Sequence, residues 1–108
     1  MSDTNPNLGA ELQQLSHLLE VLIIKEPDLA KAKQLSEKHQ EVLNIIRVLV
    51  SANVDAATAE YAKATEGVEK ANGEVLEAIK DLAKVAKTIN TVAKVIDILG
   101  KLAKVAGL

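Results

Sequence analysis

The chain has 108 residues, of which 48% are hydrophobic, and both values are those of one globular domain. It carries 13 basic and 15 acidic residues, a formal net charge of −2, and no cysteine, which excludes disulfides, thiolate metal sites and thiol catalysis. There is no Phe, no Trp and only one Tyr, so that any core must be built from Leu, Ile, Val and Ala.

The spacing of the apolar residues indicates helices. Gly and Pro are sparse, with 5 and 2 residues, and no long stretch alternates between apolar and polar side chains as a half-buried strand would. We therefore predict an all-α fold that forms a single domain over residues 1–108.

The first half of the chain predicts a helical hairpin. The first helix spans about residues 6–25, because Asn5 is a good N-cap and Pro6 is tolerated at the first helical position. Pro27 then ends this helix and begins a second one, at about residues 27–52. Leucines spaced by three and four residues form a stripe on the first helix: Leu8, Leu12, Leu15, Leu19 and Leu22.

The second half of the chain has a stricter pattern, with two sets of apolar residues that repeat every seven positions. The first set is Val54, Tyr61, Val68, Val75, Leu82, Ile89, Ile96 and Ala103. The second set is Ala57, Ala64, Ala71, Ala78, Val85, Val92, Leu99 and Ala106. Together they make the pattern of a coiled-coil seam.

The dipeptide Asn72-Gly73 decides between two architectures. Both seven-residue sets pass across it in phase, which predicts one long coiled-coil-like helix, residues 55–106, against which the hairpin packs. Asn-Gly is also a common helix end, with glycine as the left-handed cap. The alternative is therefore an up-down four-helix bundle broken at Asn72-Gly73, and the sequence leaves open whether the chain turns there.

The sequence offers no pattern typical of a catalytic or metal site. Gln14 and Ser36 stand three residues before His17 and His39, so that the Glu-x-x-His pairs of di-iron bundles are missing. No nucleophile, zinc, phosphate-loop or calcium-loop motif is present. We predict no enzyme activity and no cofactor, with His17 on the surface and the role of His39 open.

Composition also limits the partners and the location of the protein. A slightly acidic chain with the single arginine Arg47 and no aromatic platform for bases predicts no nucleic-acid binding. The opening residues lack a signal-like apolar core, and no uncharged apolar stretch approaches the ~20 residues that span a bilayer. We expect a cytoplasmic protein.

The C-terminal third suggests how the protein functions. Beyond Val92 the apolar residues spread outside the seam, so that a long helix would protrude with this surface in water unless copies of the chain packed together. We therefore predict a homo-oligomer with a self-assembly or adaptor function, or one that binds another protein partner. The expected interface residues are Leu82, Val85, Ile89, Val92, Val95, Ile96, Ile98, Leu99 and Leu102.

An alternative function is binding to a membrane surface. Residues 75–108 hold six lysines against three acids, and residues 82–108 combine lysines with aliphatic residues as a cationic amphipathic helix does. The candidate membrane contacts are spaced by seven: Lys80, Lys87, Lys94 and Lys101. A third reading is a small-ligand carrier that uses the bundle interior near His39.

Overall fold

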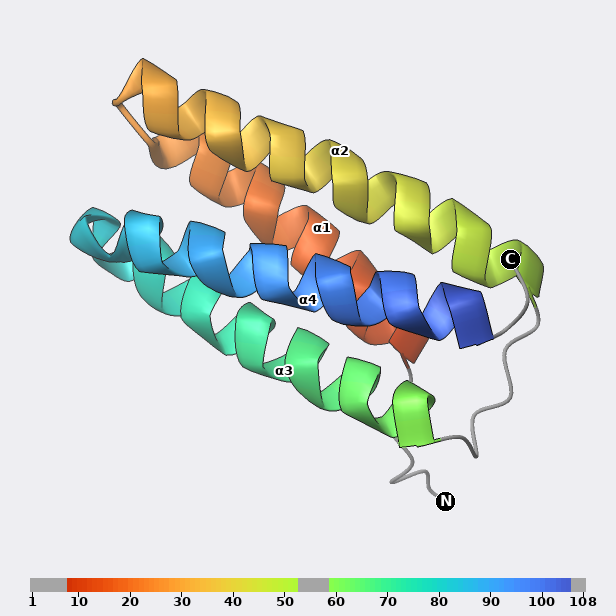
Figure 1. The fold of residues 1–108 in the computed structure, drawn as a ribbon. Helices are drawn as coiled ribbons and strands as arrows, with labels where there is room; N and C mark the ends of the chain where they lie inside the picture. The colour runs from red at the N-terminus through yellow and green to blue at the C-terminus, as the bar shows by residue number, and fades with distance from the viewer. Residues whose placement is uncertain (1–7, 53–58, 106–108) are drawn as a thin grey trace.

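The protein folds into a bundle of helices, shown in Figure 1, and the computed structural model describes residues 8–52 and 59–105, apart from the side chains of residues 50–52. The elements in these ranges are α1 (Leu8–Lys25), α2 (Leu29–Ala52), α3 (Ala59–Lys80), the short 3-10 helix η1 (Leu82–Lys84) and α4 (Val85–Val105). The prediction of an all-α fold is confirmed.

The four α-helices of the described residues close into a ring. α1 packs against α2 and α3, and α4 packs against the same two helices from the opposite side. α1 and α3 run in one direction, whereas α2 and α4 run in the other (Figure 1). Consequently α2 and α4 are neighbours, although the whole of α3 separates them in the sequence.

The predicted helical hairpin is present as α1 and α2. The predicted leucine stripe of α1 is buried in the core. α2 begins at Leu29, two residues after the predicted start, because Asp28 is its N-cap: the Asp28 carboxylate accepts hydrogen bonds from the backbone N–H of Ala30 at 2.9 Å and of Lys31 at 3.2 Å. The Glu26 carboxylate in turn accepts a bond from the N–H of Asp28 at 3.1 Å.

The predicted continuous helix over residues 55–106 is wrong, because the chain reverses after Lys80. Asp81 leaves the helical conformation, with φ −142° and ψ 96°, and its carboxylate accepts a hydrogen bond from the N–H of Ala83 at 3.1 Å. α4 then runs back along α3 (Figure 1). The alternative predicted a four-helix bundle, and the described residues form one, but it placed the break at Asn72-Gly73, and both residues lie inside α3.

The seven-residue pattern hid this reversal because α4 is apolar over a wide arc. The second predicted set stays buried in both helices, as Ala71 in α3 and Val92 in α4 show. The first set is buried at Val68 and Val75 in α3, but in α4 it moves to the edge of the core, where Ile89 and Ile96 are half-buried. Three residues take its place in the centre: Thr88, Val95 and Leu102.

Asn72 connects two helices instead of forming a turn. Its side chain is only 4% exposed, and its Nδ2 donates to the backbone oxygen of Glu11 at 3.1 Å and to Glu11 Oε1 at 2.9 Å. Gly73 lies on the exposed side of α3. The pair is therefore compatible with a helix because the asparagine has partners in α1 and the glycine is in open space.

Three predicted boundaries lie outside the described residues. They are the start of the first helix at Asn5-Pro6, the start of the third near Asp55, and the end of the last near Ala106.

Replacing Gly73 with alanine tests the position of the reversal. A β-carbon at this position meets no atom within 4 Å, and alanine is favoured over glycine inside a helix. We expect Gly73→Ala to raise the free energy of unfolding by about 0.5–1 kcal/mol in urea titrations. A loss of stability would instead indicate that Gly73 needs the left-handed conformation of a turn.

Asp81→Ala tests the cap at the reversal. Loss of the carboxylate that accepts from Ala83 should lower the free energy of unfolding by about 1 kcal/mol. Asp97→Ala is the matched control, because Asp97 is an exposed acid within α4 and should change stability by less than about 0.5 kcal/mol. Equal effects of the two substitutions would contradict a capping role for Asp81.

Candidate functional site

The aliphatic residues predicted to form an oligomer interface are divided between core and surface. Five of the nine are at most 3% exposed in the single chain: Val85, Val92, Val95, Leu99 and Leu102. The other four are half-buried: Leu82, Ile89, Ile96 and Ile98. The buried five already pack within one chain, so they offer no surface to a second copy in this fold. The prediction of a homo-oligomer was based on a long protruding helix, and the chain instead folds back as α4. The oligomeric state stays a prediction.

The predicted lysine stripe is interrupted by the reversal. Lys87, Lys94 and Lys101 lie on the exposed side of α4, whereas Lys80 is the last residue of α3 and belongs to another helix. A fourth exposed lysine of α4, Lys104, was not part of the predicted stripe. Within the described ranges none of the four α4 lysines has a carboxylate at ion-pair distance.

Charge is segregated between the two sides of the ring. α2 has four basic and two acidic residues, a net charge of +2, and α4 has four basic residues and one acidic, a net charge of +3. α1 has a net charge of −1 and α3 of −2. Because α2 lies beside α4 and α1 beside α3, the bundle has a cationic α2/α4 face and an acidic α1/α3 face.

The sequence interpretation missed the contribution of α2 to this surface. Its basic residues are Lys31, Lys33, Lys38 and Arg47. A count of net charge for each helix would have identified α2 as cationic. That α2 and α4 are neighbours is, by contrast, a property of the packing that no local pattern indicates.

A groove lined by two isoleucines, a glycine and three charged residues follows the boundary between α2 and α4. Its volume is about 440 Å³, and its lining residues are Ile45, Ile96, Asp97, Gly100, Lys101 and Lys104. Ile45 and Ile96 are half-buried, and Val48, one turn beyond Ile45 in α2, is 40% exposed. The α2/α4 face therefore combines lysines with accessible aliphatic surface.

A second groove lies on the α3 side of α4. Its volume is about 550 Å³, and it is lined by Glu60, Lys63, Ile98, Lys101, Lys104 and Val105. Lys101 and Lys104 consequently stand on a ridge between two grooves. Val105, at 58% exposure, is the most exposed large aliphatic residue of α4 in the described part of the chain.

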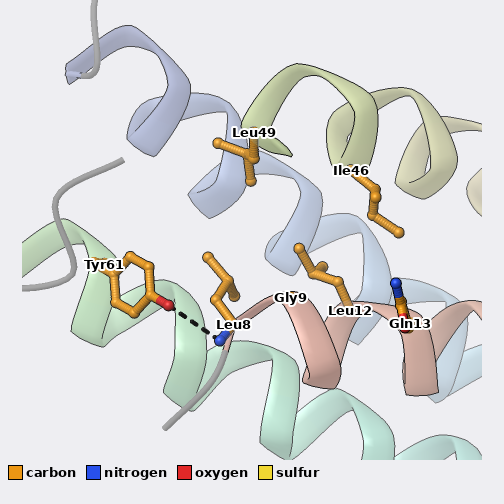
Figure 2. Close-up of a pocket in the computed structure, with 7 residues that line it drawn as sticks. All are labelled: Leu8, Gly9, Leu12, Gln13, Ile46, Leu49 and Tyr61. Atoms are coloured by element: carbon orange, nitrogen blue, oxygen red, sulfur yellow. Dashed lines mark hydrogen bonds between the residues drawn. The ribbon is translucent and has the colours of Figure 1, made fainter. Parts of the chain in front are cut away.

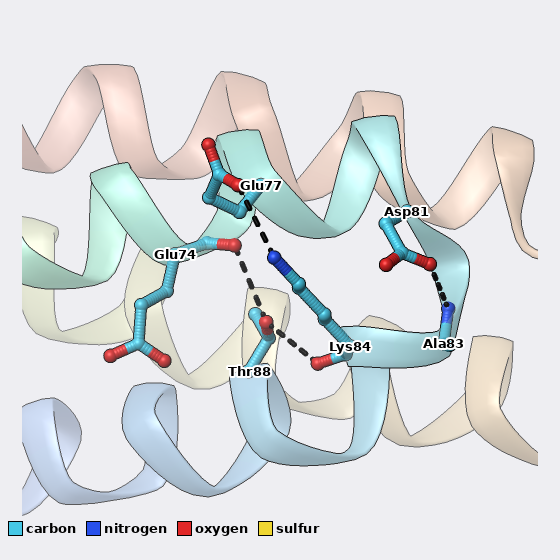
Figure 3. Close-up of polar contacts among 6 residues, drawn as sticks. All are labelled: Glu74, Glu77, Asp81, Ala83, Lys84 and Thr88. Atoms are coloured by element: carbon cyan, nitrogen blue, oxygen red, sulfur yellow. Dashed lines mark hydrogen bonds and ion pairs between the residues drawn. The ribbon is translucent and has the colours of Figure 1, made fainter.

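Polar contacts connect residues on the two sides of the α3–α4 turn, and Figure 3 shows those of Glu77, Asp81 and Thr88. Glu77 forms an ion pair with Lys84 at 3.3 Å, and the Thr88 hydroxyl donates to the backbone oxygen of Lys84 at 3.1 Å and of Glu74 at 3.4 Å. The Thr91 hydroxyl donates to the Glu74 carboxylate at 2.8 Å. The contacts of Glu77 with Lys84 and of Glu74 with Thr88 and Thr91 connect α3 to η1 and α4.

The two histidines occupy different environments. His39 Nε2 lies 3.0 Å from the hydroxyl oxygen of Ser16, a hydrogen bond between α2 and α1, whereas His17 is exposed. In the described part of the chain no three His, Asp or Glu side chains gather as metal ligands. No helix among these residues is long and apolar enough to cross a membrane.

Comparison with protein-family models, with curated proteins and with solved structures gave no match to this chain. The function must therefore be argued from the geometry and charge of the bundle itself.

Proposed function

We propose that this chain is a non-enzymatic cytoplasmic protein whose α2/α4 face docks on an anionic lipid surface while the bundle stays intact. The observation that supports this proposal is the charge of two adjacent helices, +2 for α2 and +3 for α4, in a chain whose net charge is −2. The cytoplasmic leaflet carries anionic lipids and a negative surface potential, which would attract this face.

The charge distribution also favours one orientation of the bundle. Each Lys or Arg close to an anionic membrane contributes about 1 kcal/mol, and this attraction is lost within a Debye length of ~8 Å at physiological ionic strength. The α1/α3 face has a net charge of −3, the sum of −1 and −2, and would be repelled by the same surface. Docking through α2 and α4 brings the cationic face to the membrane and keeps the acidic α1/α3 face on the side away from it.

The groove between α2 and α4 supplies the apolar part of the contact. Ile45, Ile96 and the exposed Val48 can meet the glycerol and upper acyl region of the lipids. Lys101 and Lys104 at the edge of this groove have four-carbon stems that can lie along apolar surface while their ammonium groups reach the phosphates.

An intact bundle is a better membrane-binding unit than a released α4. Val85, Val92, Leu99 and Leu102 are fully buried against the other helices. Removing each large aliphatic residue from the core costs about 1.5–3 kcal/mol until lipid covers it again. The four lysines of α4 are already exposed, so that electrostatic docking needs no such step.

A second candidate function is the predicted self-assembly, through the interface residues that remain accessible. Ile89 and Ile96 are half-buried; Ile96 lines the groove with Ile45 of α2, and Ile89 lies two turns before it on the same side of α4. A symmetric dimer presents the same patch on both copies, and pairing through this face would oppose two surfaces that each have a net charge of +5, the sum of +2 and +3. An anionic surface neutralises that charge instead, and for this reason lipid binding is the leading proposal.

Light scattering in solution distinguishes the two candidates. Lipid docking predicts a monomer at low ionic strength, where repulsion between cationic faces is strongest. A stable dimer under these conditions, dissociated by Ile96→Asp, would favour self-assembly and overturn lipid docking as the leading function.

Replacing lysines of α4 tests lipid docking directly. Lys94→Gln/Lys101→Gln removes two exposed cations, which at about 1 kcal/mol each predicts roughly 30-fold weaker binding to phosphatidylserine vesicles in co-sedimentation. The matched control is Lys25→Gln/Lys70→Gln on α1 and α3, which changes the net charge equally and should weaken binding less than about threefold.

Salt and lipid composition complete this test. Binding of the unaltered chain should disappear in neutral phosphatidylcholine vesicles and at about 1 M salt, where the Debye length falls to ~3 Å. Failure to bind phosphatidylserine vesicles, or equal losses in the two double variants, would contradict docking through the α2/α4 face.

A further inference from the structure

A separate cavity lies at the end of the bundle that contains Tyr61. It is a hollow partly open to solvent, lined by residues of α1, α2 and α3, and has a volume of about 210 Å³. Figure 2 shows its lining residues: Leu8, Gly9, Leu12, Gln13, Ile46, Leu49 and Tyr61. It does not include His39, and it shares no lining residue with the two grooves beside α4.

The walls of this cavity are aliphatic. Leu8, Leu12 and Leu49 are between 2% and 9% exposed, and Ile46 is half-buried. Aliphatic atoms that line such a hollow face water, and covering them with an apolar group is favourable. An aliphatic hollow of this size is therefore suited to an apolar group from outside the bundle.

The volume sets the size of that group. An engineered cavity of about 150 Å³ lined by Leu, Ile and Phe stays dry and binds benzene. The cavity beside Tyr61, at about 210 Å³, accommodates a six-membered ring with one or two additional heavy atoms. Larger lipids and nucleotides exceed this volume.

The polar groups of the cavity are few and uncharged. The Tyr61 hydroxyl accepts a hydrogen bond from the backbone N–H of Leu8 at 3.2 Å, and this contact places the hydroxyl beside the cavity (Figure 2). The side-chain amide of the exposed Gln13 is the other polar side chain of the lining. Since none of the lining residues is charged, the cavity is matched to a neutral ligand with one hydrogen-bonding group.

We propose that this cavity is a binding site for a small neutral amphiphile, with an apolar ring or an aliphatic chain of similar volume and one hydroxyl or amide group. The apolar part lies between Leu12, Ile46 and Leu49, and the polar group lies at the side-chain amide of the exposed Gln13, which can both donate and accept a hydrogen bond. This inference stands on the cavity alone and does not depend on membrane docking.

Cyclohexanol is a suitable probe, because it has this chemistry and does not absorb where tyrosine does. Tyr61 is the only tyrosine of the chain and there is no tryptophan, so that intrinsic emission reports on this cavity alone. We expect a saturable change in Tyr61 emission with a dissociation constant below about 1 mM. We also expect nuclear Overhauser effects from cyclohexanol to the methyl groups of Leu12, Ile46 and Leu49.

Filling the cavity provides the matched comparison. Ile46→Phe places additional side-chain volume in the cavity and should weaken cyclohexanol binding at least about tenfold while the melting temperature stays equal or rises. Leu76→Phe introduces the same side chain on α3 at a position that is 40% exposed and outside the cavity lining, and should leave the affinity unchanged.

Two results would overturn the proposal. One is the absence of methyl contacts with cyclohexanol in the unaltered chain, which is measured without any variant and so does not depend on whether Ile46→Phe folds. The other is equal affinity in folded Ile46→Phe and in the unaltered chain.

Discussion

The reversal of the chain at Asp81 is the constraint on which the rest of this structure depends. α4 is apolar over so wide an arc that it needs neighbours on most sides, and a core without Phe or Trp has only small and branched side chains to provide them. By turning back, α4 packs between α3 and α2 and buries Val85, Val92 and Leu99 within one chain. The same step brings the two cationic helices together, and the α2/α4 face exists only because of it.

Polar contacts specify how the aliphatic helices are paired. Burial of Leu, Val and Ala is not directional, so that such side chains alone leave the rotation and register of each helix weakly fixed. Asn72 bonded to Glu11 joins α3 to α1, Ser16 bonded to His39 joins α1 to α2, and Thr91 bonded to Glu74 joins α4 to α3. Each of these bonds requires one particular alignment of its two helices.

Local chemistry predicted much of the fold, and packing decided the remainder. Leucine spacing and the Glu26-Pro27-Asp28 segment predicted the helical hairpin, because caps and stops act over a few residues. No Gly or Pro lies next to Asp81 in the sequence. The only local signal for a helix end is the Asp81 carboxylate itself, which precedes an apolar run, and the sequence analysis did not use it. The seven-residue pattern did not indicate the reversal. Val95 and Ile96 are both aliphatic, so that either residue can occupy the buried side of α4. The candidate site was predicted only within α4, at its exposed lysines and at Ile96, because tertiary contacts determine which helices are neighbours.

The distance between spin labels at Lys63 and Lys101 tests the reversal most directly. Both side chains are exposed and line the same groove between α3 and α4. The bundle predicts a short separation, near the roughly 10 Å between packed helix axes lengthened by the label arms. An unbroken helix would instead separate the two positions by about 57 Å, at 1.5 Å per residue, and such a distance in a monomeric sample would contradict the fold and the cationic face built on it.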